Sequence, residues 1–132
     1  MSHSSVIRQY VYETDNWRRL ITFFIQENVS FKTRLSEIVD VIPDNEDLAA
    51  VEKFQEDFLS QDRIVAFLSY ELQEQKKLLE KDVCETGELF EDIIKHQQEL
   101  RKEIKKTEEI FSKMKEEFGE YLAGKFNCFI LF

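Results

Sequence analysis

Residues that break helices are scarce in this chain. Its 132 residues include 3 Gly and 1 Pro, and the strong breakers before Gly119 are Pro43 and Gly87. Sheet-rich folds use Gly and Pro in their many tight turns, so an all-β or α/β architecture is hard to build here. Pro43 and Gly87 leave segments 1–42, 44–86 and 88–132, which are 42, 43 and 45 residues long. We therefore expect one all-α domain, 1–132, with three long helices.

Two short segments have the features of turns between helices. Pro43 disfavours a helical conformation at the residue before it, and Asp44–Asp47 offers capping side chains for a following helix. The second segment, Asp82–Gly87, contains two alternative caps and a flexible glycine. We expect these to be the turns of the molecule. The expected helices are 13–42, 44–83 and 87–123, followed by an apolar tail at 124–132.

The first twelve residues allow two interpretations. Val6–Tyr12 is rich in β-branched and aromatic side chains, which favour extended structure. Residues 1–12 are therefore either an extended arm or an additional piece of the first helix.

Each long segment has apolar residues at alternating spacings of three and four, the pattern of a helix with one buried stripe. We call this stripe a seam. The first seam contains Trp17, Ile21, Phe24, Asn28, Phe31, Leu35, Ile38 and Ile42; the second contains Val51, Phe54, Phe58, Gln61, Val65, Leu68, Leu72, Gln75 and Leu79; the third contains Phe90, Ile93, Gln97, Leu100, Ile104, Thr107, Phe111, Met114, Phe118 and Tyr121. The regular spacing predicts an antiparallel three-helix bundle with coiled-coil-like seams and a buried Trp17.

Polar residues interrupt the seams at five positions: Asn28, Gln61, Gln75, Gln97 and Thr107. Polar seam residues typically fix register and partner number in helical assemblies, at some cost in stability. The alternative is that they line a small polar cavity for a ligand. Asp92 and His96 stand one helical turn apart. They could supply half of a metal-binding pair or form a hydrogen bond on the helix surface.

No residue pattern indicates catalysis. A carboxylate di-metal site needs Glu three residues before an inward-facing His, but Ile93 occupies that position before His96, and the other histidine is His3. Cys84 and Cys128 lack zinc-site spacing, and the glycines do not form a phosphate-binding loop. We expect a non-enzymatic protein without a cofactor and without stoichiometric zinc or iron.

Charge and targeting features narrow the class of protein further. The net charge of −9 disfavours binding to nucleic acid. Two cysteines are too few for a disulfide scaffold, and no signal peptide or bilayer-spanning apolar run is visible. We therefore expect a cytoplasmic protein and do not expect membrane binding. An alternative is a membrane-peripheral protein anchored by the apolar Phe126–Phe132 tail.

Several large apolar residues lie outside the seams and predict self-association. A three-helix bundle needs one stripe per helix, and a second stripe is most economically covered by a second copy. The candidate interface residues are Leu20, Phe23, Ile25, Ile64 and Phe67. The alternative is that these side chains widen the core or are tolerated at the surface. We expect a homodimer that acts as a structural or protein-interaction module, with a ligand-binding or metal-binding bundle as the main alternative.

The chain also resembles a group of short, uncharacterised bacterial helical-bundle proteins. The similar stretches are Trp17, Phe31–Val39, Val51–Gln61, His96–Arg101 and Glu117–Leu122, which together touch all three expected helices. The resemblance implies a helical bundle, and it implies no catalytic residues because the group has no assigned activity.

Overall fold

Three long helices make up the fold, as the sequence predicts. The computed structural model describes residues 3–41, 47–81 and 87–125. Helix α1 spans His3–Val39, α2 spans Leu48–Glu80 and α3 spans Gly87–Lys125. The described residues contain no strand. The fold class is therefore all-α.

The helix ends fall close to the expected turns. Helix α1 ends at Val39, ahead of Pro43, and α2 ends at Glu80, ahead of the Asp82–Gly87 segment. The turn residues 42–46 and 82–86 lie outside the described residues. At the other end, α1 already begins at His3, so residues 3–12 are helical and the extended arm is not observed.

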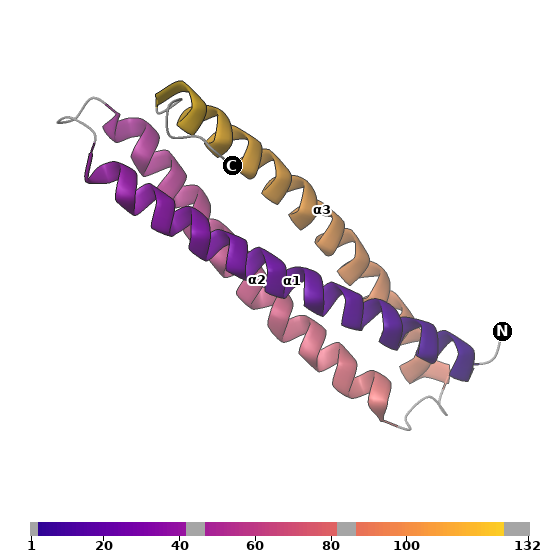
Figure 1. Ribbon diagram of the computed structural model, residues 1–132. Helices are drawn as coiled ribbons and strands as arrows, with labels where there is room; N and C mark the ends of the chain where they lie inside the picture. The colour runs from indigo at the N-terminus through magenta and orange to yellow at the C-terminus, as the bar shows by residue number, and fades with distance from the viewer. Residues whose placement is uncertain (1–2, 42–46, 82–86, 126–132) are drawn as a thin grey trace.

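The helices form an up-down-up bundle. Helix α2 runs antiparallel to α1, and α3 runs back in the direction of α1 (Figure 1). The backbones of α1 and α2 run close together over the greatest length, those of α2 and α3 over less, and those of α1 and α3 over the least. At 1.5 Å per residue, helices of 33 to 39 residues are roughly 50 to 58 Å long.

The seams account for the buried interior. All nine predicted seam residues of α2 are buried, and so are nine of the ten predicted for α3. On α1, Ile21, Phe24, Asn28, Leu35 and Ile38 are buried as predicted. One stripe per helix therefore supplies most of the buried core.

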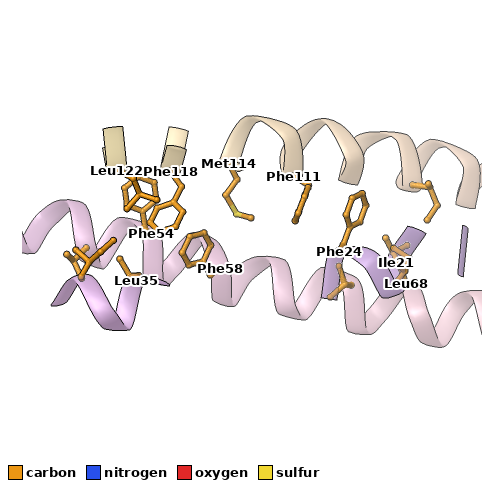
Figure 2. Close-up of a cluster of buried hydrophobic side chains, with 14 of the residues drawn as sticks. Ile21, Phe24, Leu35, Phe54, Phe58, Leu68, Phe111, Met114, Phe118 and Leu122 are labelled. Atoms are coloured by element: carbon orange, nitrogen blue, oxygen red, sulfur yellow. The ribbon is translucent and has the colours of Figure 1, made fainter. Parts of the chain in front are cut away.

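Aromatic rings fill much of this core (Figure 2). Phe58 and Phe118 are 5.1 Å apart edge to face, and Phe54 lies 5.1 Å from Phe118. Farther along the bundle, Phe24 packs 4.4 Å from Phe111. Each fully buried ring of this kind contributes about 1.5 to 3 kcal/mol to folding by leaving water.

Three described seam residues are less buried than their spacing suggests: Trp17, Phe31 and Tyr121. Trp17 packs against the core but stays partly exposed, because a large indole at the edge of a seam is rarely covered completely. Tyr121 is also partly exposed, and its hydroxyl donates a hydrogen bond to Asp47 Oδ2 at 3.3 Å. Leu122 is buried instead at this end of α3.

Ion pairs mark the three borders between helices. Their side chains are partly exposed, so each contributes about 1 kcal/mol at most. They do, however, identify which side of each helix faces which neighbour. The pairs are Lys32–Asp62 between α1 and α2 (2.7 Å), Lys53–Glu117 between α2 and α3 (2.9 Å), and Glu27–Lys115 between α1 and α3 (3.1 Å).

Candidate functional site

The polar seam residues are the first candidates for a site, and all of them are buried. Thr14 of α1, which the sequence analysis missed, is buried with them. The exposed fractions are 0% for Thr14, Asn28, Gln75 and Gln97, 1% for Gln61, and 2% for Thr107. Four of these residues belong to two hydrogen-bonded layers at different levels of the bundle.

The first layer is centred on two glutamines that face each other across α2 and α3. Gln75 Nε2 donates to Gln97 Oε1 at 3.0 Å and to the backbone oxygen of Ile93 at 3.2 Å. Gln75 Oε1 lies 2.8 Å from His96 Nδ1. Both glutamine side chains therefore bond across the helix border.

Helix α1 completes this layer. Gln97 Nε2 donates to Glu13 Oε1 at 2.9 Å and to Thr14 Oγ1 at 3.2 Å. Arg101 donates two hydrogen bonds to the same carboxylate, from Nε at 2.9 Å and from Nη2 at 2.7 Å. We call His96, Gln75, Gln97, Thr14, Glu13 and Arg101 the three-helix network. It joins all three helices.

Glu13 sets the direction of every bond in this network. An ionised carboxylate only accepts, so Gln97 must present its nitrogen to Glu13 and its oxygen to Gln75. Gln75 then presents its nitrogen to Gln97 and its oxygen to His96. His96 must therefore carry a proton on Nδ1, and in the neutral ring Nε2 is the acceptor.

The charges in the network are mutually stabilised. Burial alone would raise the pKa of Glu13, but the hydrogen bonds from Arg101 and Gln97 and the charge of Arg101 outweigh it and hold that pKa below its usual value. The hydrogen bond to Glu13 raises the pKa of Arg101. Both groups are therefore charged at neutral pH.

The network is suited to fixing the register of the helices. Its two amides and its carboxylate bond to one another, so their bonding groups are used inside the bundle. Within the described residues no group of three or more His, Cys, Asp or Glu is placed to hold a metal ion. Cys84 and Cys128 lie outside those residues. The expectation about zinc and iron stays a prediction.

A second polar layer lies near the middle of α1 and α2. Asn28 Nδ2 donates to the backbone oxygen of Phe58 at 2.9 Å and to Asp62 Oδ1 at 2.6 Å. Lys32 Nζ bonds the other oxygen of Asp62 at 2.7 Å. In the described part of the chain, however, Asn28 Oδ1 and Gln61 Nε2 are buried without a hydrogen-bond partner. This layer is only partly satisfied.

The predicted interface residues differ in exposure. Phe23, Ile25 and Phe67 are 47%, 39% and 59% exposed. Leu20 and Ile64 are partly buried and pack against the core, which is the arrangement expected for residues that widen it. Whether the chain self-associates stays a prediction.

The exposed members of this set face different borders. Phe23 lies on the side of α3, because its ring is 6.5 Å from the ring of Phe111. Ile25 precedes Lys32 by one heptad, and Lys32 pairs with Asp62 of α2. Since residues one heptad apart share a face, Ile25 lies on the side of α2.

Phe67 lies on the third border. It follows Lys53 by two heptads, and Lys53 pairs with Glu117 of α3. The exposed side of α2 that carries Phe67 therefore turns toward α3. The structure does not bring Phe23, Ile25 and Phe67 together into one patch.

The remaining candidates concern membranes. No helix within the described ranges is both long and apolar enough to cross a bilayer. The Phe126–Phe132 tail, which carries the membrane-peripheral alternative, lies outside those ranges.

Fold and polar layers together define this chain as a three-helix bundle with a partly buried network across its helices. The chain matches no protein-family model, no curated protein and no solved structure. The resemblance to short bacterial helical-bundle proteins stays a prediction.

Proposed function

We propose that this protein is a non-enzymatic structural or protein-interaction module of the cytoplasm, a coiled-coil-type rod that associates as a homodimer. Two features support the proposal. Most inward-facing positions hold apolar side chains, and two of the buried amides, Gln75 and Gln97, bond to each other. Large apolar side chains remain on the outer surface.

The exposed apolar side chains are the observation that carries the proposal. They lie outside seams that are already filled, so the core of one chain does not need them. Burying a side chain of this size in an interface contributes up to about 1.5 to 3 kcal/mol, and association costs several kcal/mol in lost motion. Several such side chains must therefore meet in one patch.

The border between α1 and α2 best meets this requirement. Ile25, Val29 and Leu59 are 39%, 52% and 47% exposed. Because Asn28 bonds to the backbone of Phe58, this part of α1 lies beside the helical turn of α2 that contains Leu59. Val29 follows Ile25 by one turn, so the three side chains form a stripe along the border.

A second copy is the occupant we propose for this stripe. A two-fold axis places a stripe against its own copy, so one set of residues supplies both sides of the interface. The neighbouring Lys32–Asp62 pair already neutralises its own charges, which lowers the cost of covering it.

Sedimentation of four variants tests this proposal. Three variants each place one carboxylate on a different border: Ile25→Glu, Phe23→Glu and Phe67→Glu. The control, Gln26→Glu, places a carboxylate at an exposed position of α1. We expect the unmodified protein to be a dimer at about 100 μM and Ile25→Glu to be monomeric with unchanged helical content. The other three variants should remain dimeric. A monomeric unmodified protein would contradict self-association, and dissociation by Phe23→Glu or Phe67→Glu alone would assign the interface to another border.

A further inference from the structure

A groove of about 540 Å³ lies between α1 and α2, beside the N-terminal half of α1. Its size is within the range of small-molecule sites. The buried side chains of Ile21 and Leu72 line it between the two helices. The polar and charged lining residues are Asp15, Arg18, Arg19 and Thr22 of α1, and Ser69 and Lys76 of α2.

The charge of this groove is opposite to that of the whole chain. Three of its lining side chains are cationic and one is a carboxylate, which gives a local charge of +2, whereas the chain carries −9. A local reversal of this kind concentrates anions at the groove, most strongly at low ionic strength.

Asp15 holds two of the cations near each other. Lys76 Nζ lies 2.9 Å from Asp15 Oδ1, and Arg18 Nη1 lies 3.8 Å from the same oxygen. One carboxylate oxygen thus orients a cation from each of the two helices. Arg19 is held separately by a hydrogen bond to Asn16 Oδ1. Among the residues that line the groove, the single negative charge of Asp15 leaves these cations only partly neutralised.

Other nearby groups modify the site only slightly. Glu80 Oε1 is 3.9 Å from Lys76, but Glu80 does not line the groove and its side chain is 58% exposed, so solvent screens this pair. The Thr22 hydroxyl donates to the backbone oxygen of Arg18, so it does not serve an anion. The Ser69 hydroxyl, on the α2 wall, is a suitable donor.

We propose that this groove binds a small soluble molecule through a phosphate monoester group. Such a group carries nearly two negative charges at neutral pH, which matches the local +2. Arginine guanidinium groups bond well to phosphate oxygens because they present paired donors. The phosphate would lie among Arg18, Arg19 and Lys76, with the rest of the molecule along the groove.

Two other grooves of the described residues do not share this charge. The groove at the far end of the α1–α2 border is lined by one cation and one acid, Lys32 and Asp40. The groove between α1 and α3 has Arg34 and Lys115 against Glu27. Their local charges are 0 and +1, so neither matches a phosphate monoester as well.

NMR titration of the full chain with glycerol 3-phosphate tests the proposal, with glycerol as the uncharged probe and ionic strength held constant. We expect saturable amide shifts confined to residues 15–22 and 69–76, and none with glycerol. Arg18→Gln with Arg19→Gln should weaken binding about tenfold or more. The control, Lys105→Gln with Lys106→Gln, removes the same charge from exposed positions of α3 and should change affinity by less than about twofold.

Three results would overturn the proposal. The first is shifts that do not saturate and spread over the lysines and arginines of all three helices, which indicates unspecific attraction. The second is equal weakening by the groove variant and the control. The third is co-sedimentation with phosphatidic acid vesicles without saturable shifts from glycerol 3-phosphate, which would assign the groove to a lipid surface. Circular dichroism checks that the variants stay helical.

Discussion

Gln97 and Gln61 are both buried in a seam, but their amide nitrogens have opposite surroundings. Gln97 Nε2 donates to Glu13 and Thr14, whereas Gln61 Nε2 has no partner among the described residues. A buried donor without a partner costs about 1 to 3 kcal/mol. The same substitution should therefore have opposite effects at the two positions.

Replacing each glutamine with leucine tests this difference. Gln61→Leu removes an unpaired donor and adds apolar contact, so we expect the free energy of unfolding to rise by about 1 kcal/mol. Gln97→Leu removes the hydrogen bonds that Gln97 makes to Gln75, Glu13 and Thr14 and should lower the free energy of unfolding by about 2 kcal/mol or more. Urea unfolding followed by circular dichroism measures both changes. Shifts of the same sign would show that the two buried amides do not differ in the way their hydrogen bonds indicate.

The Glu13 carboxylate predicts a pH dependence with a definite sign. Its pKa in the folded protein lies below the usual 4.5, so the unfolded chain binds the proton more readily. The stabilisation from Glu13 is therefore fully present above the unfolded pKa and is lost as the pH falls through the folded pKa.

Glu13→Gln is the matching variant because glutamine resembles the protonated acid. The side chains of Glu13 and Arg101 are 28% and 49% exposed, so solvent screening limits the expected loss at pH 7 to about 1 kcal/mol. The difference between variant and parent should shrink below about pH 4. Glu99→Gln, at an exposed position of α3, is the control for lost surface charge. An equal loss of unfolding free energy at pH 7 and below about pH 4 would contradict the stabilising role of the Glu13–Arg101 pair.

At the scale of single elements, α2 and α1 differ in how completely their seams are covered. Phe58 of α2 is 0% exposed, whereas Trp17 of α1 packs against the core and stays partly exposed. Phe58→Ala should lower the free energy of unfolding by about 3 to 5 kcal/mol. Trp17→Ala should cost less, about 1 to 2 kcal/mol, because less of its surface leaves water on folding. Urea unfolding of the two variants compares them, and a larger loss for Trp17→Ala would place the indole in the core.

The helices and their buried faces were predictable because each element carries its own periodic pattern. The α2 seam runs from Val51 to Leu79 without a break, and every predicted residue in it is buried. The start of α1 was not predictable in the same way. Val6–Tyr12 favours strand locally, yet it is helical in the bundle, because tertiary context overrides a weak local preference.

The three-helix network was only half predictable. Gln75 and Gln97 were visible as polar interruptions of an apolar seam, and Thr14 could have been found because it lies three residues before Trp17 on the same spacing. Glu13 and Arg101 carry no such signal. They are 88 residues apart, and their pairing depends on the register between α1 and α3, which the pattern of one helix does not specify.

At the scale of the whole molecule, the three borders are unequal. The backbones of α1 and α2 run close together over the greatest length, and those of α1 and α3 over the least. Polar contacts also join α3 to α1. Gln97 and Arg101 bond to Glu13, and Lys115 pairs with Glu27. Such partly exposed pairs are individually weak.

This inequality predicts that α3 opens before the α1–α2 pair. Protein segments with fewer buried contacts exchange through partial unfolding at lower free energy than the rest. In native-state hydrogen exchange we expect central amides of α3 to exchange with a free energy roughly 1 to 2 kcal/mol below that of central amides of α1 and α2. Adding salt should widen the gap, because screening weakens the Glu13–Arg101 and Glu27–Lys115 pairs. Equal exchange free energies in all three helices, unchanged by salt, would mean that the bundle unfolds as one unit. The border between α1 and α3 would then be no weaker than the other two.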